Sequence, residues 1–268
     1  MRLKNKTVIV TGSCTGIGKA IAGRCVDEGA QVVINGLEQA AGEEVVNRLG
    51  KENAVLHIED ITLEGAPGRL IDTAVQRFGK LDALVNNAAM VHASNIRTTD
   101  LLLFRKILEV NSLAPFALIQ AALPHLEKTG GSVLNIGSVN AWSGEPDLLA
   151  YSVSKGALMT LTRNLGDMLH RDHGVRVNQI NPGWVLTENE IRRKRDQGLP
   201  DDWYENLPDD WAPSGRILWP NEIAEAVLYY LSDAAGPVSG QVMDLEQYPF
   251  LGRNMSKDVS AIVKDQKS

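Results

Sequence analysis

Short apolar runs alternate with longer amphipathic segments along most of the chain. The short runs are rich in β-branched residues and have the length of strands, whereas the segments between them have helical periodicity. Strands are predicted at 7–10, 32–34, 54–58, 83–85, 132–136, 175–180 and 241–245. Helices are predicted at 19–28, 38–49, 69–78, 101–123, 151–172 and 221–232, the last with an N-cap at Asn221. This alternation predicts an α/β fold, a doubly wound parallel sheet with helices on both faces.

A glycine-rich turn, TGSCTGIG at 11–18, joins the first predicted strand to the first predicted helix. Gly12 lets the chain leave the strand tightly, and Gly16 lets the backbone approach a phosphate without a Cβ in the way. Gly18 lets the helix pack close to the sheet. The free N–H groups and the positive dipole end of that helix suit a pyrophosphate. The turn therefore indicates a dinucleotide site.

Composition narrows the class of protein mainly by exclusion. The chain has 268 residues, 44% of them hydrophobic and 22% charged, which suits one domain with a sizeable core. A net charge of -6 argues against nucleic acid or an anionic membrane as a partner. Two cysteines, Cys14 and Cys25, provide neither a disulfide framework nor a metal site. No apolar run has the length of a signal peptide or a membrane span, so we expect a cytoplasmic protein that holds no metal.

Tyr151 and Lys155 lie one helical turn apart in the predicted helix 151–172. A hydride leaves a carbinol carbon only as the hydroxyl proton is removed, so the reaction needs a base that works near neutral pH. A tyrosine with the ordinary pKa of about 10 is too weakly acidic for this role. Lys155 on the same helix face would favour the phenolate. Ser138 would hold the substrate oxygen by a hydrogen bond.

The order of these motifs resembles the short-chain dehydrogenase/reductase family in its compact, single-domain form, from Thr7 to about Leu245. The matching motifs are the glycine turn, Asp60, Asn86-Asn87-Ala88-Ala89, Asn111, Ser138, Tyr151-Ser152-Val153-Ser154-Lys155, and Pro182-Gly183 with Thr187. The resemblance implies a Rossmann-like fold, a homotetramer, and Asn111, Ser138, Tyr151 and Lys155 as catalytic residues. It implies that Asn111 bends a helix and helps to order a proton-relay water, and that Lys155 also holds the nicotinamide ribose. The implied cofactor contacts are Gly12, Ser13, Thr15, Gly16, Ile17, Gly18, Asp60, Ile61, Asn87, Ala88, Tyr151, Lys155, Pro182, Gly183, Val185 and Thr187.

The turn after the second strand bears on the choice between NAD and NADP. An acidic side chain there usually holds a 2′-hydroxyl, whereas a 2′-phosphate calls for a basic one. The turn contains Gly36, Leu37 and Glu38, and no cation is evident in it. Because Glu38 would repel a phosphate, we expect NAD rather than NADP. We also expect that Gly36→Asp would sharpen the preference for NAD.

A long segment at about 184–219 resembles the family's variable substrate lid. Its tryptophans, including Trp184, suit stacking on the C–H faces of a sugar, although they would equally suit a lid core or a subunit contact. The basic run 192–195 is either a solvated helix face or an anion-attracting rim of the site, and Arg195 in the rim would favour an acidic sugar. The residues expected to bind the substrate are Ser138, Asn140, Tyr151, Trp184 and Arg195.

These observations together predict a catalytic domain over 1–250 and a C-terminal extension over 251–268, which either closes over a site or frays. The predicted function is NAD(P)-dependent hydride transfer at a secondary alcohol or hemiacetal carbon, with a sugar or acidic sugar as the favoured substrate. One alternative is an NADPH-dependent reductase of 3-oxoacyl groups or small ketones. Another is a regulator that binds NAD(H) without turnover.

Overall fold

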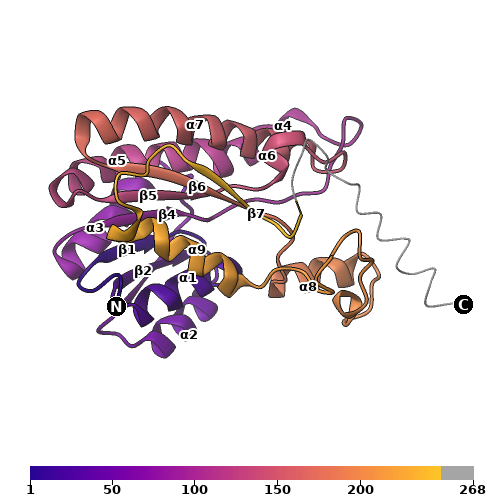
Figure 1. Cartoon of the computed structure of the whole chain (residues 1–268), viewed down its shortest axis with the longest axis horizontal. Helices are drawn as coiled ribbons and strands as arrows, with labels where there is room; N and C mark the ends of the chain where they lie inside the picture. Colours follow the sequence, from indigo (N-terminus) through magenta and orange to yellow (C-terminus); the bar gives the residue numbers. More distant parts are fainter. Residues whose placement is uncertain (249–268) are drawn as a thin grey trace, which may run out of the picture.

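A computed structural model describes residues 1–248 of the chain, so the extension predicted for 251–268 lies outside the described residues. The described residues form one seven-stranded parallel sheet covered by helices on both faces (Figure 1). The strands are β1 (Thr7–Val10), β2 (Gln31–Gly36), β3 (Ala54–Ile58), β4 (Ala83–Asn86), β5 (Ser132–Ile136), β6 (Arg176–Pro182) and β7 (Val242–Leu245). Their order in the sheet is β3-β2-β1-β4-β5-β6-β7, and the predicted doubly wound α/β fold is confirmed.

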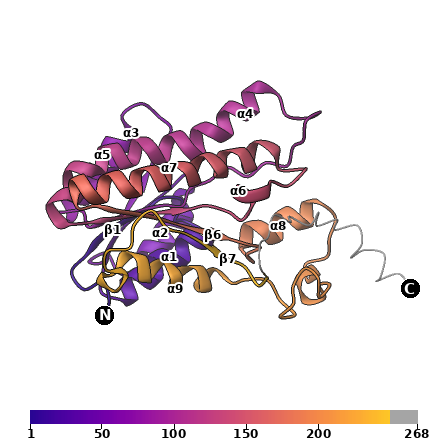
Figure 2. The ribbon, with the colours of Figure 1, turned by 45° about the horizontal axis from the view of Figure 1, so that its top comes forward.

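The longer helices are α1 (Gly16–Asp27), α2 (Gln39–Leu49), α3 (Ala66–Phe78), α4 (Leu101–Leu108), α5 (Ala114–Thr129), α7 (Leu149–His173), α8 (Glu188–Asp196) and α9 (Pro220–Leu231). The shorter ones are α6 (Asn140–Ser143), the π-helix η1 (Glu109–Leu113) and the 3₁₀ turns η2 (Trp203–Glu205) and η3 (Asp233–Ala235). Figures 1 and 2 show α1, α2 and α9 on one face of the sheet and α3, α5 and α7 on the other. The helix α8 lies beyond the ends of the strands, as Figure 2 shows.

The strands are buried on both faces because their side chains alternate between two apolar layers. Val8 and Val10 of β1 pack in the layer with α1, α2 and α9, whereas Ile9 between them packs in the layer with α3, α5 and α7. This alternation follows from the period of two along a strand. Both layers are therefore built from continuous apolar runs, which is the pattern expected of a parallel sheet.

The predicted helix 101–123 is not one regular helix. It divides into α4 and α5, with the π-helix η1 between them around Asn111. The inserted residue of a π-bulge changes the direction of the helix and is common at functional sites. By length and composition, Leu101–Thr129 would suffice to cross a membrane, but the inner face of this segment, with Leu118 and Leu126, packs in the core on the sheet.

The predicted start of the last helix is also wrong. The helix α9 begins at Pro220, so Asn221 lies inside its first turn and the N-cap is Trp219. The Glu222 carboxylate accepts from the Trp219 backbone N–H at 2.7 Å, which satisfies one of the free donors at the helix start. Proline suits the first helical position because its φ is already helical and it lacks an N–H.

Candidate active site

A cavity of about 1500 Å³ lies at the carboxyl ends of the strands, between the sheet and the lid segment 184–219. The sheet order reverses between β1 and β4, so the loops that follow these two strands diverge and leave a crevice. The cavity is lined by nearly all the residues that sequence analysis selected. These are Gly12, Thr15, Gly16, Ile17, Asp60, Ile61, Asn87, Ala88, Ser138, Asn140, Tyr151, Lys155, Pro182, Gly183, Trp184, Val185 and Thr187.

The glycine turn forms one end of the cavity and has room for the phosphates of a dinucleotide. Gly12 and Gly16 have φ values of 61° and 57°, which favour glycine. A Cβ on Gly18 would lie 2.3 Å from the Gly12 carbonyl oxygen, so the helix α1 can approach the turn only with glycine there. The Asn87 side chain donates to the Gly12 carbonyl oxygen at 3.0 Å and joins the turn to the loop after β4. These residues fit a nicotinamide dinucleotide.

Ser13 and Gly18 support this turn from behind and do not line the cavity. Ser13 is fully buried, and its hydroxyl donates to the Val10 carbonyl oxygen at 2.6 Å and accepts from the Asn35 N–H at 3.1 Å. The side chain therefore holds β1 and β2 in place beneath the turn.

The far end of the cavity, where an adenosine would lie, is bordered by acidic side chains. Burial tends to raise the pKa of Asp60, but two hydrogen bonds from Thr62 outweigh burial and hold that pKa below its usual value. Glu38 and Glu59 also line the cavity, but Glu59 is ion-paired with Arg69 at 2.6 Å. The charge of Lys106 acts on Asp60 from the cavity lining. The carboxylates give this end a negative potential.

Gly36 is more tightly enclosed than the sequence suggests. A Cβ at this position would lie 2.5 Å from the Cys14 Sγ, which is buried beneath the glycine turn. An aspartate at Gly36 would therefore push against the turn itself. The expectation that Gly36→Asp sharpens the preference for NAD stays a prediction, and the structure adds a steric cost to it. The neighbouring Leu37 is 63% exposed and lines the cavity, so this position can accept a new side chain.

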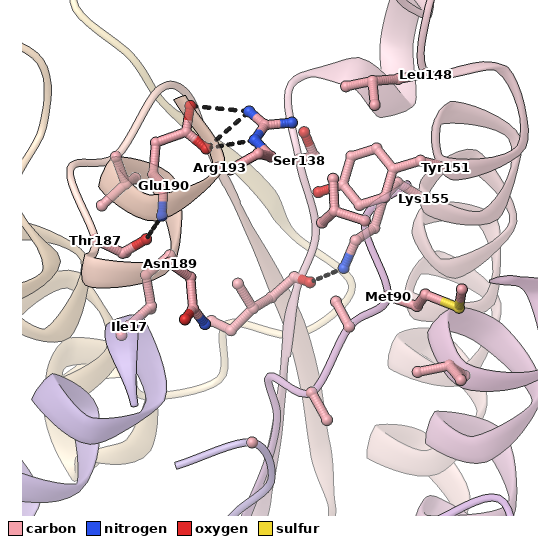
Figure 3. A pocket seen from close by; sticks show the side chains of 18 of the residues that line it. Ile17, Met90, Ser138, Leu148, Tyr151, Lys155, Thr187, Asn189, Glu190 and Arg193 are labelled. Atoms are coloured by element: carbon pink, nitrogen blue, oxygen red, sulfur yellow. Dashed lines mark hydrogen bonds and ion pairs between the residues drawn. The ribbon is translucent and has the colours of Figure 1, made fainter. Parts of the chain in front are cut away.

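Tyr151 and Lys155 project from α7 into the middle of the cavity (Figure 3). The Lys155 ammonium donates to the Ile136 carbonyl oxygen at 2.7 Å and lies 5.7 Å from the centre of the Tyr151 ring. Burial lowers the pKa of Lys155 to about 8. Burial also raises the pKa of Tyr151, while a hydrogen bond with Ser138 and the charge of Arg193 act in the opposite direction. Tyr151 therefore keeps its proton at neutral pH in this structure, and of the two groups only Lys155 has a pKa close to neutrality.

Ser138 is held by contacts with β6 and with its own loop. Its backbone N–H donates to the Asn181 Oδ1 at 3.1 Å, and its hydroxyl accepts from the Asn140 N–H at 3.2 Å. The Asn181 amide also donates to Asp244 on β7 at 2.9 Å, and the same Asp244 oxygen accepts from the Trp142 indole at 2.8 Å. The serine is therefore fixed from β6, β7 and α6 together.

Asn111 lies behind the cavity wall and does not line it. Its side chain accepts from the Met90 N–H at 2.7 Å and donates to the Met90 carbonyl oxygen at 3.0 Å. It also donates to the Ser154 hydroxyl at 2.9 Å. One residue thus joins the π-helix η1, the loop after β4 and the catalytic helix α7.

The tryptophans of the lid form a small core of their own. Trp203 is fully buried and stacks on Trp184 with ring centres 5.0 Å apart, and Trp211 and Tyr204 pack around this pair. Trp184 also lines the cavity, whereas Trp203, Tyr204 and Trp211 do not. Trp203, Tyr204 and Trp211 therefore form a core of the lid, which was one of the two alternatives for these rings. They provide no stacking platform for a sugar.

The basic run on α8 is divided between the surface and the cavity. Arg195 does not line the cavity, because its guanidinium forms a 2.6 Å ion pair with Asp201 at the surface. Arg193 does line it, and its Nε and Nη2 donate to the two oxygens of Glu190 at 2.9 and 2.8 Å. Sequence analysis missed Glu190 and included Arg193 only as part of the basic run 192–195, although the i,i+3 spacing of the two residues places them on one helix face.

Residues 1–248 contain no group of three or more His, Cys, Asp or Glu side chains that could hold a metal ion. The Glu145 carboxylate, which sequence analysis also missed, lines the cavity and accepts from the Asn140 amide at 3.2 Å. The site therefore consists of a proton-transfer group, a dinucleotide cradle and a polar wall.

The sequence of the chain is similar to a protein-family model and to several known oxidoreductases. A family model described as enoyl-(acyl carrier protein) reductase matches residues 12–246. An uncharacterized oxidoreductase of Thermotoga maritima is 34% identical over 250 residues, which are 92% of this chain and 98% of that protein. The L-fucose dehydrogenase of Rattus norvegicus is 37% identical over 235 residues, 87% of this chain and 85% of its own. The glucose 1-dehydrogenase 2 of Bacillus subtilis is 33% identical over 252 residues, 90% of this chain and 93% of its own.

Proposed function

The chain belongs to the short-chain dehydrogenase/reductase family and is an NAD(P)-dependent oxidoreductase acting on CH–OH groups, and we propose that it is an NAD-dependent dehydrogenase of a neutral sugar. The proposal rests on one observation above all. Tyr151, Lys155 and Ser138 share one cavity with the glycine turn and face a lid helix whose cavity side carries a paired carboxylate and guanidinium.

A nicotinamide dinucleotide, held by the glycine turn and the residues after β6, would supply the hydride acceptor for the substrate carbon. Tyr151 takes the hydroxyl proton, and Ser138 holds the same oxygen by a hydrogen bond. Lys155 favours the tyrosinate by its charge and holds the nicotinamide ribose. Asn111 keeps α7 and the loop after β4 in register, because its amide bonds to both. Thr187 and Pro182-Gly183 border the space proposed for the nicotinamide.

A sugar suits the polar wall around Tyr151. Glu190, Arg193, Asn140 and Glu145 present donors and acceptors to the cavity, and hydroxyl groups act as both. Relatives named L-fucose dehydrogenase and glucose 1-dehydrogenase 2 support the same substrate class. We propose a neutral rather than an acidic sugar because Arg193, whose charge acts on Tyr151, is neutralised by Glu190, and Arg195 is bound to Asp201 outside the cavity. Arg192 and Lys194 also line the cavity, so the acidic sugars in the panel below test this choice directly.

The preference for NAD follows from the charges at the adenosine end. A 2′-phosphate would approach the carboxylates of Glu38 and Asp60, which would repel a dianion at short range, whereas Glu59 is neutralised by Arg69. The adenosine hydroxyls of NAD carry no charge and accept or donate hydrogen bonds there. We therefore propose NAD as the physiological cofactor.

The test is a panel in which purified protein meets NAD or NADP with neutral sugars, acidic sugars, polyols and simple secondary alcohols. We expect reduction of NAD by a neutral sugar. A requirement for NADP, or activity only with acyl thioesters and NADPH, would contradict the proposal and favour an acyl reductase.

The variant Tyr151→Phe distinguishes an enzyme from the alternative function, a regulator that binds NAD(H) without turnover. Tyr151→Phe should abolish reduction of NAD while NAD binding, followed by calorimetry, stays within about twofold. Tyr229→Phe is the matched control, because Tyr229 lies 41% exposed on α9, away from the cavity. Full turnover by Tyr151→Phe would refute the assigned role.

We also propose a cytoplasmic homotetramer. Exposed apolar side chains lie along α4, η1, α5 and α7, and a subunit interface would cover them. They are Leu101, Leu102, Leu113, Phe116, Val153 and Met168. Light scattering should give four times the chain mass of 29.2 kDa, and a monomer at micromolar concentration would contradict the proposal.

A further inference from the structure

Arg193 is held rigidly on the cavity side of α8. Its Nε and Nη2 donate to the Glu190 carboxylate, one helical turn earlier, and the Trp184 indole donates to the same carboxylate at 2.8 Å. The Thr187 hydroxyl caps the helix by accepting from the Glu190 N–H at 3.1 Å. A guanidinium bound at two of its nitrogens has a fixed plane and a fixed direction.

The guanidinium extends from the lid toward Ser138 and Tyr151, as Figure 3 shows. The pKa of Tyr151 responds to the charges of both Arg193 and Glu190, which places the pair within electrostatic reach of the phenol. Among residues 1–248, no acceptor is bound to the Arg193 Nη1. Arg192 and Arg195 are occupied elsewhere, by Asn189 at 2.7 Å and by Asp201 at 2.6 Å.

Arg193 keeps one donor for a substrate oxygen. Glu190 bonds the Nε–Nη2 edge of the guanidinium, so the Nη1 lies on the opposite side, directed away from Glu190 (Figure 3). A substrate hydroxyl can accept from this Nη1, because a hydroxyl oxygen has acceptor positions. The charge of Glu190 offsets that of Arg193, so the pair attracts a carboxylate less than a lone arginine would.

We propose that Arg193, oriented by Glu190, is a specificity-determining residue that binds a hydroxyl on the carbon next to the reacting carbon. The substrate class is then the vicinal diol, of which sugars are one kind, and a simple secondary alcohol lacks the group that the pair recognises. The inference deepens the proposed function and rests on Tyr151 and Ser138 as the residues that hold the reacting oxygen.

The experiment compares matched substrates that differ by one hydroxyl. The holoenzyme with NAD is assayed for kcat/KM on butane-2,3-diol and butan-2-ol, and on the best neutral sugar and its 2-deoxy analogue. We expect the wild type to prefer the diol in each pair. In Arg193→Met the preference should fall by about 10- to 100-fold, the range for loss of a hydrogen bond from a charged group. Arg193→Lys should restore part of it.

Matched controls separate recognition from a general effect on the lid. Arg195→Met, on the same helix but paired with Asp201 at the surface, should leave the preference unchanged. Glu190→Gln should reduce the preference, because it loosens Arg193. An equal loss on diol and mono-alcohol in Arg193→Met, or no turnover of either pair by the wild type, would overturn the inference. Preference for butane-2,3-diol without turnover of any sugar would refute the sugar proposal and leave the role of Arg193 standing.

Discussion

Replacing Lys155 with methionine should make the folded protein more stable while removing its activity. Lys155 is 2% exposed, and burial lowers its pKa from 10.5 to about 8. At pH 7 the side chain is charged in both the folded and the unfolded states. The drop in pKa then corresponds to about 3 kcal/mol of unfavourable free energy in the folded state, at about 1.4 kcal/mol for each pKa unit.

Methionine fills a similar volume without the charge, but it leaves the Ile136 carbonyl oxygen without the donor that Lys155 supplies at 2.7 Å. Leaving that buried carbonyl oxygen without a donor costs about 2 kcal/mol. The net gain in the free energy of unfolding at pH 7 is therefore about 1 kcal/mol. In a protein of this size it should raise the melting temperature by about 2 to 4 °C. Turnover should fall by more than about 100-fold, because Tyr151 loses the charge that favours its phenolate.

The stability that Lys155→Met gains over the wild type must fall as the pH rises. Between about pH 8 and 10.5 the unfolded chain keeps the proton on Lys155 whereas the folded protein has lost it, so the wild type gains stability as pH rises. The advantage of Lys155→Met should therefore shrink between pH 7 and pH 10. Thermal and urea unfolding at both pH values measure it, with Lys128→Met at an exposed position as the control. A variant that is less stable at pH 7, or an advantage that is equal at both pH values, would refute the reasoning.

Two further predictions concern the walls of the cavity. Gly36→Asp should lower the free energy of unfolding by about 1 to 3 kcal/mol through its contact with Cys14. Leu37→Asp, at an exposed position, should change it by less than about 0.5 kcal/mol. Leu37→Asp should also increase the ratio of NAD affinity to NADP affinity measured by calorimetry. A stable Gly36→Asp protein would contradict the steric argument. Asn181→Leu removes the acceptor of the Ser138 N–H and should lower kcat by about 10-fold without weakening NAD binding, so a parallel loss of NAD affinity would contradict a specific role in placing the serine.

The sheet could be predicted because its determinants are local. Each strand is a short apolar run bounded by turn residues, and the predicted strand 54–58 coincides with β3. The predicted start of α9 failed by one residue, because Pro220, adjacent to the predicted N-cap Asn221, is itself the first residue of the helix. The break at η1 was implied only by the resemblance that singled out Asn111, because its cause is a set of contacts with Met90 and Ser154, distant in the chain.

In the candidate site, too, some residues could be predicted from local sequence and others could not. Residues carried by motifs, such as Tyr151 and Lys155, line the cavity, because a turn of helix fixes their spacing. The basic run 192–195 did not reveal that Arg192, Arg193 and Lys194 line the cavity whereas Arg195 does not. That choice depends on the rotation of α8 about its axis, which is fixed by the contact of Trp184 with Glu190. The clash at Gly36 was hidden for a similar reason, because Cys14 meets it only through the pairing of β1 with β2.

The separate aromatic core of the lid has an evolutionary consequence. Trp184, Trp203 and the residues packed around them hold the shape of the lid without help from the two apolar layers of the sheet. Substitutions at Arg193 therefore exchange the chemistry offered to a ligand while Glu190, bound to Trp184, and the aromatic core keep the form of the lid. Selection can thus change what the enzyme recognises at one cavity-lining position, with the hydride-transfer apparatus inherited intact.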